Sequence, residues 1–93
     1  MSDTPPERVT LKETTVGQLG PIDVGSGNFW ERDFDVDGAS VRQMSARLAP
    51  FDGDDVTVRV GSTVTVGGAA WRVVGIDKTP GENGQITLER VLA

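Results

Sequence analysis

The sequence predicts an all-β fold, a small antiparallel barrel or sandwich of six to eight strands, on three observations. Apolar and polar residues alternate with a period of two along several segments, as half-buried strands do. Glycine-containing pairs interrupt these segments where the chain must reverse. The 93 residues hold no cysteine, so hydrophobic packing within one small domain, or assembly with partners, must stabilise the fold.

The chain is expected to form a single domain over residues 8–93, after a disordered tail at residues 1–7 that contains two prolines. Alternating residues from position 8 predict a first strand that ends near residue 17. The glycine-rich residues 20–27 are expected to form a loop, with at most a short extended piece at 22–24.

The next strand is expected over residues 28–36, with one face in the core and one acidic face. The inward face would carry three large side chains, Trp30, Phe34 and Val36. Phe29 would lie off that face, and Arg32 would fall on the inward side, where it must reach the edge or pair with a carboxylate. Asp37-Gly38 then predicts a hairpin turn.

Residues 39–49 fit two structures. A helix could begin at Ser40 as N-cap, with Gln43 three residues later, and end before Pro50. A strand would instead place Met44, Ala46 and Leu48 inside and Ser45 and Arg47 outside. A turn dipeptide directly after a strand favours a hairpin, and we therefore expect a strand.

The C-terminal part, residues 56–92, predicts a meander of antiparallel strands. Residues 69–77 are apolar on both faces and are expected to form the central strand, with Trp71 in the core. Gly61-Ser62 and Gly67-Gly68 are expected at two reversals, and a polar loop over residues 78–84, which ends in the turn signal Asn83-Gly84, is expected before the closing strand.

The segment from Gly61 to Ile76, GSTVTVGGAAWRVVGI, followed by Ile86-Thr-Leu88, resembles the strand-turn-strand core of SH3-like small barrels. It is also similar to small uncharacterised all-β proteins of actinobacterial type, and in general form to the small barrels that join phage heads to tails. The resemblance implies a barrel used for interaction. It implies no particular site.

Composition narrows the function classes. Fourteen acidic and nine basic residues give a net charge of −5, and the basic residues are scattered, so no nucleic-acid surface is expected. No apolar run is long enough to span a membrane, and the predicted location is cytoplasmic. Without histidine or cysteine the chain lacks the usual general bases, thiolates and triads, so we expect no enzyme and no cofactor. A carboxylate-dependent enzyme stays open as an alternative.

One acidic cluster resembles the opening of a calcium loop. Asp33, Asp35 and Asp37, followed by glycine, match its first ligand positions, but its twelfth position is Met44 instead of glutamate. Alternate aspartates on a flat strand do not enclose an ion, so a solvated acidic face is the competing interpretation. Calcium binding through these three aspartates is retained as the alternative function.

The main functional prediction is a non-enzymatic interaction or assembly module that binds a protein partner or a second copy of itself. Phe29 and Phe51 are the candidates for exposed apolar contacts. An acidic loop formed by Asp52, Asp54 and Asp55 would suit a basic partner surface or a divalent ion.

Overall fold

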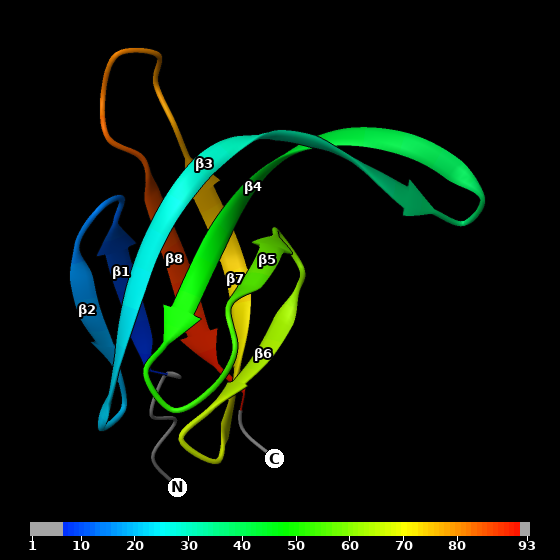
Figure 1. The fold of residues 1–93 in the computed structure, drawn as a ribbon. Helices are drawn as coiled ribbons and strands as arrows, with labels where there is room; N and C mark the ends of the chain where they lie inside the picture. The colour runs from blue at the N-terminus through cyan, green and yellow to red at the C-terminus, as the bar shows by residue number, and fades with distance from the viewer. Residues whose placement is uncertain (1–6, 92–93) are drawn as a thin grey trace, which may run out of the picture.

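The structure, a computed structural model, describes residues 7–91 and consists there of eight strands in two antiparallel sheets of four (Figure 1). The all-β prediction is confirmed, in its sandwich form. The predicted tail lies outside the described residues except for Glu7, whose carbonyl accepts a hydrogen bond from the Arg90 amide. The strands are β1 (Arg8–Lys12), β2 (Val16–Leu19), β3 (Ile22–Val36), β4 (Ala39–Pro50), β5 (Val56–Arg59), β6 (Thr63–Val66), β7 (Ala69–Asp77) and β8 (Gln85–Arg90).

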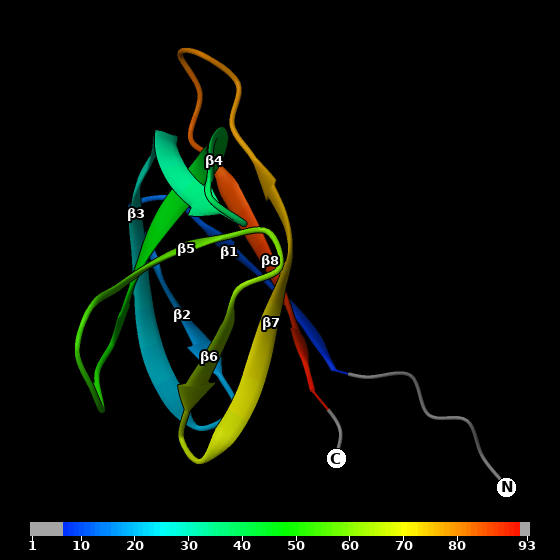
Figure 2. The same cartoon turned by 90° about the vertical axis from the view of Figure 1, so that its right-hand side faces the viewer.

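The two sheets have the orders β1-β8-β7-β6 and β2-β3-β4-β5, and they face each other as two layers (Figure 2). The predicted meander is correct for β6, β7 and β8. It is wrong for β5, which pairs with β4 in the other sheet. Gly61-Ser62 therefore carries the chain from one sheet to the other and does not form a hairpin.

The core lies between the sheets and takes inward residues from all eight strands. Trp71 is 1% exposed and is the largest fully buried side chain. The alternation that predicted these strands explains their inward faces, because every second residue points to the same side. The buried apolar residues are Leu11, Leu19, Val24, Phe29, Ala46, Leu48, Val58, Val66, Trp71, Val73, Ile86 and Leu88.

β3 and β4 form a long hairpin, so residues 39–49 are a strand, as expected, and not a helix. Its turn is Asp37-Gly38, with φ of 51° and 82°, the left-handed pair that a two-residue hairpin turn requires. The predicted loop at 20–27 is wrong, because β3 already begins at Ile22. The predicted first strand is interrupted at residues 13–15, where the chain turns from β1 into β2.

A bulge in β3 reverses the predicted orientation of its aromatic residues. The β3–β4 register shifts between Gly27 and Trp30, and Asn28 has a φ of 54°. An extra residue in one strand breaks the alternation. Phe29 is consequently 4% exposed and Trp30 is 47% exposed, the opposite of what the sequence predicted.

Two further orientations differ from the prediction. Arg32 is exposed and lies over the Trp30 ring, because the bulge turns the even positions of β3 that follow it away from the core. Ser45, expected outside, is fully buried, and its hydroxyl donates to the Trp30 carbonyl at 2.8 Å.

The polar loop expected at residues 78–84 is confirmed between β7 and β8, but the tight turn expected within it at Asn83-Gly84 is wrong. β7 and β8 are joined by a longer loop in which Gly81 has the positive φ, of 83°. Gly84 is buried, and its position requires glycine for a steric reason: a Cβ there would lie 2.5 Å from Phe29 Cδ2 and 3.1 Å from the Asp77 carbonyl oxygen. Glycine at this position allows the loop to close over the Phe29 ring.

Gly84→Ala is expected to lower the free energy of unfolding by about 1–3 kcal/mol, because the added methyl group overpacks the site against backbone and an aromatic ring. Chemical denaturation measures the change. Gly53→Ala is the matched control, since a Cβ at Gly53 would meet nothing within 4 Å. Equal stability of the two variants would contradict the packing described for Gly84.

Candidate functional site

The β3–β4 hairpin continues well beyond the two sheets and curls over one end of the sandwich (Figures 1 and 2). β2 pairs with β3 only over Ile22–Gly25, and β5 pairs with β4 only over Ser45–Leu48. Within the described residues, the stretch from Trp30 to Ser45 therefore pairs with itself, and only its last residue, Ser45, also pairs with β5, at Arg59. We call residues 30–45 the ribbon.

The ribbon has two chemically different faces, because residues paired across an antiparallel hairpin lie on the same side. Phe34 pairs with Val41, and Arg32 pairs with Gln43. We call the resulting surface the aromatic face; it consists of Trp30, Arg32, Phe34, Val36, Val41 and Gln43. The opposite face, which we call the acidic face, carries Glu31, Asp33, Asp35, Arg42 and Met44.

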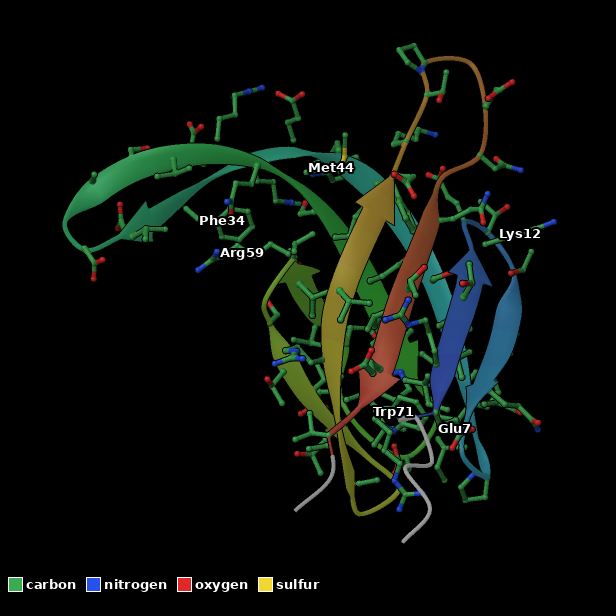
Figure 3. The ribbon with its side chains drawn as sticks, turned by 180° about the vertical axis from the view of Figure 1, so that it is seen from behind. Glu7, Lys12, Phe34, Met44, Arg59 and Trp71 are labelled. Carbon is green, nitrogen blue, oxygen red and sulfur yellow. The ribbon has the colours of Figure 1, made fainter. Side chains whose placement is uncertain are left out.

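Two arginines lie on the rings of the aromatic face. The Arg32 guanidinium carbon is 4.8 Å from the Trp30 ring centroid, and that of Arg59, from β5, is 5.4 Å from the Phe34 centroid. Arg59 also donates to the Gln43 side-chain oxygen at 3.0 Å, and Figure 3 shows Phe34 and Arg59 adjacent below the ribbon. Within residues 7–91 neither guanidinium has a carboxylate at ion-pair distance. The face thus combines apolar surface with unpaired positive charge.

The acidic face contains the predicted calcium residues. Arg42 donates to Glu31 at 3.0 Å and to Asp33 at 3.4 Å, whereas Asp37 lies in the hairpin turn. In the part of the chain that the structure describes, no three acidic, histidine or cysteine side chains are grouped so that they could hold a metal ion. The three aspartates are therefore not brought together, and calcium binding stays a prediction from the sequence.

Millimolar calcium is expected to leave the melting temperature unchanged, because only a ligand that binds the folded state with useful affinity raises it. A melt with and without calcium tests this. An increase of several degrees that disappears when Asp33, Asp35 and Asp37 become asparagine would contradict this expectation and support a cation module.

The predicted acidic loop borders a cleft. This cleft, of about 320 Å³, lies between the edge strands β5 and β6, and Leu48, Val56, Val64 and Val66 are among its lining residues. Asp52 and Asp54 line it as well. The Asp52 carboxylate accepts from the Gly67 amide at 2.9 Å, so the loop is tied to the turn between β6 and β7.

The remaining predicted contact residues lie in three different environments. Phe51 is 72% exposed beside the cleft, as expected of a contact residue. Asp55 forms an ion pair with Arg47 at 2.8 Å. Phe29 is buried against Gly84, so its predicted role as an exposed contact is wrong. We call residues 51–55 the Phe51 loop.

Sequence reasoning missed the aromatic face because it placed Trp30 and Arg32 toward the core. One signal in the sequence could have revealed it. An arginine two residues after a tryptophan on a supposed core face is costly unless that face is exposed. The structure adds the second reason: β3 and β4, with 15 and 12 residues, are much longer than their four-residue neighbours β2 and β5, so β2 and β5 cannot cover the far ends.

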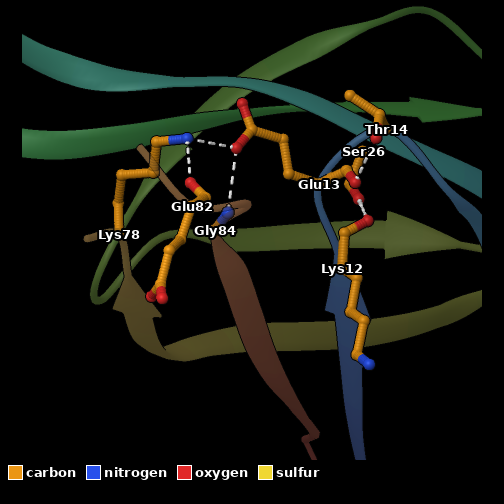
Figure 4. A network of polar contacts seen from close by, with 7 residues as sticks. All are labelled: Lys12, Glu13, Thr14, Ser26, Lys78, Glu82 and Gly84. Carbon is orange, nitrogen blue, oxygen red and sulfur yellow. Dashed lines mark hydrogen bonds and ion pairs between the residues drawn. The ribbon is translucent and has the colours of Figure 1, made fainter. Parts of the chain in front are cut away.

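A half-buried ion pair fixes the β7–β8 loop next to the β1–β2 turn (Figure 4). Glu13 Oε1 accepts from Lys78 Nζ at 2.6 Å and from the Gly84 amide at 2.8 Å, and Lys78 also donates to the Glu82 carbonyl. The hydrogen bond from Lys78, followed by that from Gly84, lowers the pKa of the Glu13 carboxyl below its ordinary value. This ion pair links two loops of the fold, and its residues do not line the cleft between β5 and β6.

The pKa of the Glu13 carboxyl is lower in the folded state than in the unfolded state, so the ionised carboxylate stabilises the fold. This stabilisation is complete at pH values above the ordinary carboxyl pKa, and it is lost as the pH falls through the pKa of Glu13 in the folded protein. Glu13→Gln is expected to cost about 1 kcal/mol at pH 7, and the difference from wild type should shrink in acid. Denaturant unfolding between pH 7 and pH 3 measures both. Glu82→Gln is the control, since the contact of Glu82 with Lys78 uses its backbone carbonyl; a pH-independent effect of Glu13→Gln would contradict the linkage.

The described residues include no helix of the length and hydropathy needed to cross a membrane.

Comparison with known proteins gives one result. The model of a family of unknown function, DUF6406, matches residues 6–92. No curated protein and no solved structure matches the chain significantly. The resemblance to SH3-like small barrels and to small all-β proteins of actinobacterial type therefore stays a prediction. Because the family match spans nearly the whole sequence, the chain belongs to this family of unknown function, DUF6406.

Proposed function

We propose that the protein is a non-enzymatic interaction or assembly module, and that the aromatic face of the ribbon is its contact surface. The observation that carries the proposal is the projection of this face beyond the sandwich, with Trp30 47% exposed. Contiguous apolar surface on a small protein usually marks an interaction site.

Energetics support a partner for the ribbon. A two-stranded hairpin without a third layer is only marginally stable in water. Covering a tryptophan removes on the order of 100 Å² of apolar surface from water, which contributes about 2–3 kcal/mol at roughly 25 cal/mol per Å². A bound partner would therefore both order the ribbon and gain affinity from it.

The chemistry of the chain favours binding over catalysis. The sequence has no histidine or cysteine. The carboxylate with a lowered pKa, Glu13, accepts hydrogen bonds from Lys78 and Gly84 inside the fold. The acidic, cysteine-free composition suits the cytoplasm, which we propose as its location, with a protein partner or a second copy as ligand.

Affinity capture tests the proposal with a double variant, Trp30→Ser with Arg32→Glu, against wild type. Asp35→Ser, on the acidic face, is the matched control. We expect wild type and the control to retain the same protein partner, or to self-associate by light scattering, and the double variant to lose it. A wild-type protein that both stays monomeric and retains no partner that the double variant loses would contradict the proposal, and so would turnover of a substrate.

A further inference from the structure

We infer that the partner of the aromatic face is a second copy of this chain, which contributes its Phe51 loop, so that copies join head to tail. The inference rests on the proposed function and names its partner. It follows from the complementary chemistry of two surfaces on the same molecule.

The Phe51 loop presents an apolar knob with acidic neighbours. Phe51 is the most exposed of the large hydrophobic side chains in the described residues, at 72%. Its amide donates to the Asp23 carbonyl at 2.9 Å, and the Asp52 carboxylate is held by the Gly67 amide. The loop is thus pre-organised, which lowers the entropy cost of binding through it.

The aromatic face offers the matching groups. Its exposed Trp30 ring provides apolar surface of the kind that contacts a phenylalanine at a preferred edge or offset geometry. Arg32 and Arg59 have no carboxylate partner within residues 7–91, and Asp54 has no cationic partner there. Docking a loop that carries Phe51 and Asp54 would therefore cover the exposed ring and pair these charges together.

The two surfaces cannot meet within one molecule. The near end of the aromatic face, Trp30, pairs with Ser45, which lies six residues before Phe51 along extended β4, roughly 20 Å at ~3.4 Å per residue, and the ribbon turn is a full 12-residue strand away. They lie at opposite ends of the protein (Figure 1). The contact must therefore form between molecules.

Charge also selects the mode of association. Each copy carries a net charge of −5, so most approaches of two copies are repulsive. A symmetric contact between two aromatic faces would bring arginines of like charge together. A contact between an aromatic face and a Phe51 loop instead brings opposite charges together, and such a heterologous contact repeats into a ring or an open filament.

The experiment mixes two variants that each lack one surface. The face variant carries Trp30→Ser and Arg32→Glu, and the loop variant carries Phe51→Ser and Asp54→Lys; all four side chains are exposed, so both should fold. In sedimentation velocity, wild type is expected to form species larger than a dimer, and each variant alone to associate at least tenfold more weakly. An equimolar mixture should form a one-to-one dimer and nothing larger, because one intact face meets one intact loop.

Other outcomes overturn the inference. A loop variant that still associates as wild type shows that the Phe51 loop is not the occupant. A wild type that is monomeric at every concentration excludes self-association, while the proposed function survives if capture still retains another protein that depends on Trp30. A mixture that stays monomeric although wild type associates also contradicts head-to-tail joining. Higher salt should weaken the wild-type assembly, since the paired charges are screened.

Discussion

Replacing Trp71 with alanine will lower the free energy of unfolding by about 3–5 kcal/mol, the range for removing a fully buried tryptophan. The side chain is 1% exposed and belongs to the cluster that joins the two sheets. A domain of this size has a total stability of about 5–15 kcal/mol, so the variant will be close to unfolding at room temperature. Urea denaturation followed by circular dichroism measures the change.

The same substitution at the other tryptophan is the control. Trp30→Ala should cost less than about 1 kcal/mol, because Trp30 is 47% exposed and lies outside the core. Trp71→Phe should be much milder than Trp71→Ala, since it keeps most of the ring volume and removes an indole nitrogen that has no hydrogen-bond partner in the described residues. Similar losses for the alanine variants at both tryptophans would contradict the assigned burial.

Shortening the ribbon will abolish binding and leave the sandwich folded. Replacing residues 32–43 by Asn-Gly joins the paired residues Glu31 and Met44 through a two-residue turn. We expect the free energy of unfolding to change by no more than about 1 kcal/mol, because the lost contacts of Arg59 with Phe34 and Gln43 are half-buried and lie outside the core. Denaturation and affinity capture, run on the same preparation, measure the two effects. A shortened protein that does not fold, or one that folds and still binds as wild type does, would contradict this division of roles.

Local patterns account for the parts of the fold that were predicted correctly. Asp37-Gly38 specifies its hairpin through its own backbone preference, and the alternation of β6 to β8 specifies their inward faces. β5 has the same alternation, but its sheet is decided by pairing with β4, and no local pattern encodes that pairing. The bulge at Asn28 is likewise set by the packing of Phe29 under the β7–β8 loop, which lies far away in the sequence.

Only the part of the candidate site that lies in an exposed loop, the Phe51 loop, could be predicted from the sequence. Phe51 and Asp54 were expected at the surface because they follow Pro50 in a turn-forming segment, and both are exposed. The aromatic face could not be derived in this way. Its existence depends on the bulge, which moves Trp30 from the core face to the outer face, and on the short length of β5, which leaves the ribbon uncovered.

The most direct test of the central proposal is the solvent accessibility of Trp30 in an associated sample. The chain has two tryptophans, so Trp71→Phe leaves Trp30 as the only one. Acrylamide quenching of its fluorescence is then measured across a concentration series, or with a captured partner added, while light scattering reports the mass. We predict that Trp30 becomes protected from quenching in step with complex formation. A complex in which Trp30 is quenched as readily as in the monomer would show that the aromatic face is not the contact surface.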